Sequence, residues 1–253
     1  MVVEQGQELW RPSQQQMAQS GLVHYMDWLS QSRGRKFDDY QSLWNWTVND
    51  LDGFWRSIWD YFDIQANGDP TQVLANRSMP GAQWFPNTEL NYAEHIFRNA
   101  SAERPAIIAR CEAAEPVQVS WAQLQGDVGA LAAKLRELGV SSGDRVVAYL
   151  PNIAQTVVAF LACASIGAIW SSCAPEMGVS VVLDRFQQIK PKLIFATDSY
   201  SYAGKTFDRR AVLDEVLQGL PEIEHVVHVP GPLFKPDDAA SALPWRDTMS
   251  WQQ

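Results

Sequence analysis

The chain has 253 residues, 46% of them hydrophobic, and a formal net charge of -9. This length and composition support one large domain or two modest ones, and they exclude disorder along the whole chain. The acidic balance, without a run of Lys or Arg, makes nucleic acid and anionic membrane poor partners, so an anionic ligand needs local basic residues.

Residues 1–100 have the spacing of amphipathic helices and carry seven of the 11 Trp residues. Apolar side chains recur at helical intervals from Val23 to Leu29 and again from Leu51 to Phe62, as on a helix face that is buried. We therefore expect a helical, Trp-rich N-terminal region at 1–100 that packs as a cap on the main domain. Core packing is the simpler explanation of these aromatic residues, and a ligand box is the alternative.

Short β-rich runs alternate with helices in the next part of the chain. Strands are predicted at 106–110 and 117–120, and Ser120 is placed to cap the N-terminus of a helix, with Gln123 at the capping-box position. That helix ends at Gly139 and presents one apolar face to a sheet. The face consists of Leu124, Val128, Leu131, Leu135 and Leu138.

Four further strands alternate with helices. Such alternation implies right-handed βαβ crossovers and a largely parallel sheet with helices on both faces. We therefore predict an α/β fold in which residues 101–230 form a first, layered α/β subdomain. Residues 231–253 have no periodicity and are expected to be a linker or loop tail. The four strands are predicted at 145–150, 168–172, 192–197 and 224–229.

The segment Ala203-Gly204-Lys205-Thr206 is predicted to join a strand to a helix, as a phosphate-binding loop does. It is not a Walker A motif, because Ser199 stands where that motif needs a glycine and the intervening tyrosines block a close backbone approach. What remains is Lys205 near a helix N-terminus at the carboxyl end of a strand, the usual ligand side of an α/β sheet. A solvated loop lysine is the alternative.

Other candidate groups have simpler explanations. Cys111, Cys163 and Cys173 are odd in number and lack a CxxC spacing, which predicts reduced thiols and a cytoplasmic protein. Cys173 has no His near it in sequence, so a core thiol is preferred over a nucleophile. His225 and His228 are three apart in a predicted strand and point to opposite faces, so no metal site is predicted. The longest apolar stretch is too short to span a bilayer, so we expect a soluble protein.

Five segments carry a resemblance to a known family: Leu9 to Ser13 (Leu-Trp-Arg-Pro-Ser), Phe37 to Tyr40, Trp44 to Val48, Met79 to Ala82 (Met-Pro-Gly-Ala) and Trp84 to Phe97. There, and over almost its whole length, the chain resembles the acetoacetyl-CoA synthetases of the adenylate-forming acyl-CoA synthetase superfamily. The resemblance implies a two-step ligase with acetoacetate, ATP, Mg²⁺ and CoA as small-molecule partners. Acetoacetyl-AMP and pyrophosphate form first, and the CoA thiol then displaces AMP. An acetyl- or propionyl-CoA synthetase relative is the alternative within the superfamily.

The resemblance also implies site residues. In related synthetases a loop that begins with Asp and ends in Arg-Ala-Gly-Arg contacts the nucleotide end of CoA. Here Asp198 matches its start and Tyr202-Ala203-Gly204-Lys205 its end. Lys205 keeps a charge for a phosphate, whereas Tyr202 replaces an arginine and is limited to stacking or hydrogen bonding. Ser171 and Ser172 match a turn near the pantetheine path, where acetyl-specific enzymes have glycines, and hydroxyls that cap the following turn are the alternative.

The family's ATP-binding motifs are not found in the 253 residues: the Ser/Thr/Gly-rich phosphate loop, the aromatic-acidic adenine motif, the acidic ribose ligand and the C-terminal lysine. In the family layout the phosphate loop follows shortly after the position of Gln253. We therefore expect the N-terminal portion of a ligase, with no catalytic residue of its own, inactive by itself and partnered by a missing C-terminal portion. A stand-alone CoA- or nucleotide-binding module and an interaction protein with a Trp-rich face are the alternatives.

Overall fold

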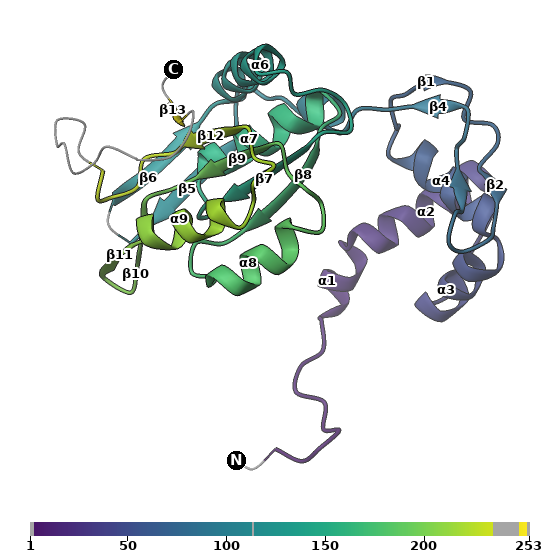
Figure 1. Ribbon diagram of the computed structural model, residues 1–253. Coiled ribbons are helices and arrows are strands. Elements are labelled where there is room, and N and C mark those ends of the chain that lie inside the picture. The colour runs from purple at the N-terminus through teal and green to yellow at the C-terminus, as the bar shows by residue number, and fades with distance from the viewer. Residues whose placement is uncertain (1–2, 113, 235–247, 252–253) are drawn as a thin grey trace. The chain divides into compact units, whose positions relative to one another are not determined.

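The computed structural model describes residues 3–112, 114–234 and 248–251, and Figure 1 shows its helices and strands. The chain divides into two compact units, Met1–Leu90 and Asn91–Gln253. The first unit is mainly helical and the second is an α/β unit. None of the described helices is both long enough and apolar enough to span a bilayer.

The first unit combines helices with two small antiparallel strand pairs. Its elements are α1 (Gln14–Ala18), α2 (Gly21–Arg33), α3 (Tyr40–Asn49), α4 (Leu51–Tyr61), β1 (Asn67–Gly68), β2 (Leu74–Asn76), β3 (Gln83–Trp84) and β4 (Thr88–Glu89). Strand β1 pairs with β4, and β2 pairs with β3. Polar side chains begin the helices because they accept the free amide hydrogens of the first turn, as Ser13 and Asp39 do in their capping boxes.

Aromatic residues supply much of the core of the first unit. Tyr25, Leu29 and Trp46 are buried in one cluster, and the Tyr25 ring packs edge-on against Tyr61 with centroids 5.0 Å apart. The Tyr25 hydroxyl and Ser57 Oγ share a buried hydrogen bond of 2.5 Å, which satisfies the polar end of the ring. Helical spacing identified this core only in part: Leu29 and Trp59 of the predicted faces are buried, whereas Trp55 and Phe62 are exposed.

The second unit alternates strands and helices along the chain. Its elements are α5 (Tyr92–Phe97), β5 (Ile107–Cys111), β6 (Ala114–Val119), α6 (Trp121–Glu137), β7 (Arg145–Tyr149), α7 (Ala154–Ser165), β8 (Ile169–Cys173), α8 (Val179–Phe186), β9 (Leu193–Ala196), β10 (Ser199–Tyr202), β11 (Lys205–Asp208), α9 (Arg210–Gln218), β12 (His225–His228) and β13 (Thr248–Ser250). Five strands form a sheet in the order β13-β12-β9-β7-β8, and every neighbouring pair is parallel. Strands β5 and β6, and likewise β10 and β11, form antiparallel pairs outside this sheet.

Helices cover both faces of the parallel sheet, as Figure 1 shows. Helices α6 and α7 pack on the face that carries Val146, Ala148 and Phe195, and helices α8 and α9 pack on the face that carries Val147 and Ile194. Successive residues of a strand point to opposite faces, so β7 and β9 are apolar on both sides, as a strand inside a parallel sheet must be. The predicted α/β fold class is confirmed.

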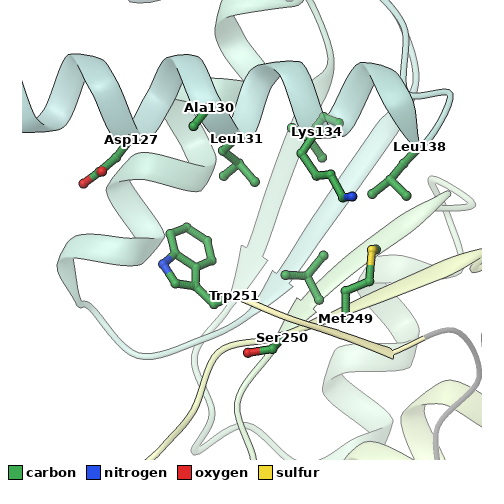
Figure 2. A pocket seen from close by; sticks show the side chains of 10 residues that line it. Asp127, Ala130, Leu131, Lys134, Leu138, Met249, Ser250 and Trp251 are labelled. Carbon is green, nitrogen blue, oxygen red and sulfur yellow. The ribbon is translucent and has the colours of Figure 1, made fainter. Parts of the chain in front are cut away.

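Helix α6 confirms three of the five positions of the predicted apolar face, whereas Leu131 and Leu138 are only partly buried. Leu124, Val128 and Leu135 are buried. Leu131 is only partly buried, and Ala132 takes the buried place next to it. Leu131 lines a pocket of about 300 Å³ between α6 and strands β12 and β13, which Figure 2 shows from close by. The pocket is also lined by Lys134, Leu138, Val227, Met249 and Trp251.

A strand forms where the sequence predicted only a linker or loop. Residues Thr248–Ser250 make β13, which pairs in parallel with β12 through Val226 and Thr248 at its first register position. Part of segment 231–253 therefore belongs to the sheet. Positions 235–247 of that segment lie outside the described residues.

Candidate functional site

The segment that contains Lys205 is a β-hairpin. Strands β10 and β11 are antiparallel, and Tyr202 pairs with Lys205 across the turn. The two turn residues, Ala203 and Gly204, have φ values of 51° and 71°, as a type I′ turn requires, and this turn matches the natural twist of two paired strands. The predicted position of Lys205 at a helix N-terminus is therefore wrong, because α9 begins at Arg210, beyond the whole of β11.

One face of the hairpin combines aromatic rings with a cation. Directly opposed residues of an antiparallel pair point to the same side, so Tyr200, Phe207, Tyr202 and Lys205 share a face. The rings of Tyr200 and Phe207 stack with centroids 5.1 Å apart, and the Arg209 guanidinium lies 5.3 Å from the centroid of the Tyr200 ring. Tyr202 is 66% exposed and Lys205 is also exposed, so an aromatic ring and an ammonium are open to a ligand at the tip.

A carboxylate from the segment between β5 and β6 contacts the hairpin turn. Glu112 Oε2 accepts a hydrogen bond from the Gly204 amide at 2.9 Å. The Gly204 amide is therefore taken, and a negative charge lies beside the turn. A phosphate at this tip must be held by the Lys205 side chain, as a point charge, and not by a cradle of backbone N–H groups.

The base of the hairpin is polar and buried. Asp198 is only 3% exposed, and its carboxylate lies 2.9 Å from His228 Nε2 and accepts from the Gly231 amide at 2.8 Å and the Ser199 hydroxyl at 2.9 Å. Burial alone would raise the pKa of Asp198, but these hydrogen bonds outweigh it and hold the pKa below its usual value. Asp198 is thus a buried anchor at the base of the hairpin.

Ser171 and Ser172 lie in a different part of the sheet. Both belong to β8 and pair with Val147 and Ala148 of β7; Ser171 is partly buried and Ser172 is exposed. Both serines lie in the strand that the sequence predicted at 168–172, which continues to Cys173, so they precede the turn with which the resemblance associates them. Strand β7 lies between β8 and β9, the strand that leads into the hairpin, so the serines and Lys205 come from strands that are not neighbours.

Sequence reasoning did not single out Tyr149. The residue is fully buried, and its hydroxyl oxygen lies 2.6 and 2.7 Å from the carbonyl oxygens of Pro175 and Met177, which share its one proton. Burial raises the pKa of this hydroxyl to about 12, so it keeps its proton and donates at neutral pH. Tyr149 thereby fixes the turn that leaves β8 at the carboxyl end of the sheet. The available signal was a polar-tipped ring within an otherwise apolar strand.

Two protein-family models match this chain. The family model of AMP-binding enzymes matches residues 95–250, more than half of the chain. The chain belongs to the family of AMP-binding enzymes. A second model, the N-terminus of acetyl-coenzyme A synthetase, matches residues 40–96. The β10–β11 hairpin and β8 both lie within the part that matches the AMP-binding enzymes.

Within this family the chain is similar to acetoacetyl-CoA synthetases. It is 36% identical over 239 residues to that of Danio rerio and 37% identical over 240 residues to that of Xenopus tropicalis, with 93% of this chain and 35% of each relative covered. The solved structure of acetoacetyl-CoA synthetase from Streptomyces lividans matches with a TM-score of 0.87 at 42% identity, covering 97% of this chain and 37% of that chain. The resemblance to acetoacetyl-CoA synthetases is confirmed. The chain spans about a third of the length of these relatives.

Proposed function

We propose that this chain forms part of an acetoacetate–CoA ligase and that its β10–β11 hairpin binds the nucleotide end of CoA. In the first step a carboxylate oxygen of acetoacetate attacks the α-phosphorus of ATP and pyrophosphate leaves. In the second step the CoA sulfur attacks the acyl carbon and AMP leaves. The names of the relatives support the choice of acid. The observation that carries the CoA assignment is an exposed ring and an exposed ammonium on one face of the hairpin tip.

Each residue of the hairpin tip has a separate proposed role. Lys205 pairs with a phosphate of CoA as a point charge, and Tyr202 stacks on the base or donates its hydroxyl. Ala203 and Gly204 provide the positive-φ turn that brings the two side chains to the same face. Ser171 and Ser172 are proposed to line the pantetheine path along β8, where the hydroxyls of partly buried Ser171 and exposed Ser172 can donate to its amide carbonyls.

Mg²⁺ is proposed to arrive with ATP. The described residues contain no group of three or more His, Cys, Asp or Glu side chains that is placed to hold a metal ion. No described residue is therefore assigned to Mg²⁺, and none of the roles above depends on it. The protein is proposed to work in the cytoplasm, a reducing compartment that suits three unpaired cysteines.

Calorimetric titration of the 253-residue protein with CoA tests the proposed site. Lys205→Ala is expected to weaken CoA binding roughly ten-fold, because it removes one partly exposed charge-assisted contact of about 1 to 2 kcal/mol. The matched control is Lys36→Ala, which removes an exposed lysine from the first unit. Equal affinity of the Lys205 and Lys36 variants would show that Lys205 is a solvated surface lysine.

A separate measurement concerns the adenylation step. The 253-residue protein alone is expected to give no acetoacetate-dependent exchange of pyrophosphate into ATP, because none of the residues assigned above contacts ATP. The control is a full-length acetoacetyl-CoA synthetase assayed in parallel. Exchange above the no-enzyme background would mean that these 253 residues include ATP-binding groups which the proposal does not recognise.

A further inference from the structure

The buried base of the β10–β11 hairpin joins three parts of the second unit. The Asp198 carboxylate contacts His228 at the end of β12 and the Gly231 amide in the loop after it. The Asp198 main-chain oxygen accepts from the Arg209 amide at 2.7 Å, which closes the far end of the hairpin. Asp198 therefore contacts the segments that enter and leave the β10–β11 hairpin and also the loop that follows β12.

The loop after β12 is fitted tightly against the same base. The Ser199 hydroxyl oxygen accepts from the Leu233 amide at 2.9 Å, and the Phe234 ring packs edge-on against the His228 ring with centroids 5.0 Å apart. A Cβ at Gly231 would lie 2.2 Å from the Ser199 carbonyl oxygen, so only glycine allows this approach. Ser199 and His228 are each 2% exposed or less. These side chains and amides form one connected network of hydrogen bonds and packing contacts around two buried polar residues.

We propose that Asp198 and His228 are positioning residues for the nucleotide end of CoA: they fix the base of the β10–β11 hairpin and thereby the placement of Tyr202 and Lys205 at its tip. This inference rests on the proposed function of the hairpin. A two-stranded hairpin is at best marginally stable in water, so its orientation must come from contacts at its ends. The tip contact, from Glu112, is exposed, whereas at the base the contact between Asp198 and His228 is buried and the one between Asp198 and Gly231 is partly buried, so both are better shielded from water.

The test compares His228→Leu, which removes one of the hydrogen-bond partners of Asp198, with His228→Gln, whose amide nitrogen can replace Nε2. Affinity for CoA is measured by calorimetry, and amide hydrogen exchange is measured from Tyr202 to Lys205. His228→Leu is expected to weaken CoA binding roughly ten-fold and to speed exchange at the tip, whereas His228→Gln stays within about two-fold of the unaltered protein. If His228→Leu does not fold, Ser199→Ala removes one link of the same network at lower cost.

A double variant separates positioning from general destabilisation. Two residues that act through the same contact give non-additive effects, so the loss of CoA affinity in His228→Leu combined with Lys205→Ala is expected to be clearly smaller than the sum of the two single losses, the remainder coming from Tyr202. Additive losses, unchanged tip exchange, or equal affinity of His228→Leu and the unaltered protein would overturn the inference and leave the CoA site standing. Absence of any CoA binding by the unaltered protein would instead remove the proposed function, and the positioning role with it.

Discussion

At the scale of single residues, burial divides the three cysteines into two classes. Burial raises the pKa of Cys163 to about 12 and also raises that of Cys173, while Cys111 is exposed. The thiolate is the reactive form, so only Cys111 is expected to react quickly with a disulfide reagent at pH 8. One thiol should titrate in the folded protein, three in denaturant and none quickly in Cys111→Ser. A second fast thiol in the folded protein would contradict the burial of Cys163 and Cys173.

Two leucines that belong to the same predicted apolar face of α6 differ in how deeply they are buried. Leu135 is fully buried in the core above the sheet, whereas Leu131 is partly exposed and borders the pocket of Figure 2. Leu135→Asp is expected to lower the free energy of unfolding by several kcal/mol, since a carboxylate without a partner enters the core. Leu131→Asp should cost clearly less, because its carboxylate can reach water. Urea unfolding of both variants checks this order, and an equal loss in both would be evidence that Leu131 is as deeply packed as Leu135.

At the scale of elements, the hairpin turn carries a testable strain. Ala203 adopts a positive φ of 51°, a region that costs an L-residue about 1 kcal/mol or more and costs glycine nothing. Ala203→Gly is therefore expected to slow amide exchange at the tip, because the strain relieved in the turn outweighs glycine's greater entropy in the unfolded chain. Gly143→Ala is the control for the reverse change: it places an L-residue at a φ of 85° in the turn between α6 and β7 and should lower the free energy of unfolding. Faster tip exchange in Ala203→Gly would count against a strained type I′ turn.

The same hairpin shows what the sequence could and could not predict. Ser199 to Tyr202 alternate hydroxyl and aromatic side chains, and glycine occupies the second turn position, so a period-two signal was present. The turn lacks the usual Asn-Gly pair, and each strand has only four residues. The hairpin signal was therefore weak, and the segment was interpreted as a loop between a strand and a helix, as in a phosphate-binding loop. Lys205 therefore remains a candidate ligand-binding residue, but the prediction that it lies at a helix N-terminus is wrong. The Asp198–His228 contact joins residues 30 apart and is invisible to any local pattern.

At the scale of the whole molecule, long apolar runs made the parallel sheet predictable. Strands buried on both faces, such as β7 and β9, are continuous apolar segments, and helix periodicity between them fixed the α/β class. Strand β13 was missed because its three residues, Thr248 to Ser250, are too few for a period and gain their place from pairing with β12. Predictions succeeded where burial acts on a long segment, and they failed where tertiary pairing decides a short one.

The carboxylates of the whole chain predict how its stability depends on pH. Hydrogen bonds lower the pKa of Asp50, Asp144 and Asp208, the largest contributions coming from the Trp46 indole, the Ser141 amide and the Arg210 side chain, respectively. A carboxyl group whose pKa is lower in the folded state stabilises the fold fully above its ordinary value of 3.8 and loses that contribution as the pH falls through the lowered value. The free energy of unfolding contributed by these groups is therefore expected to be level from neutral pH to about pH 5 and to fall below pH 4.

Asp144 offers the cleanest test of this pH dependence. Its carboxylate accepts from the Ser141 amide at 2.9 Å and from the Ser141 hydroxyl at 3.0 Å in the turn between α6 and β7, far in sequence from the hairpin. Asp144→Asn is expected to cost about 0.5 to 1 kcal/mol at pH 7, since water screens a partly exposed group. The cost should shrink as the pH falls, because protonation removes the same charge from the unaltered protein. Urea unfolding at pH 7, 5, 4 and 3 measures both proteins, and a difference that stays constant down to pH 3 would show that the ionised form of Asp144 does not stabilise the fold.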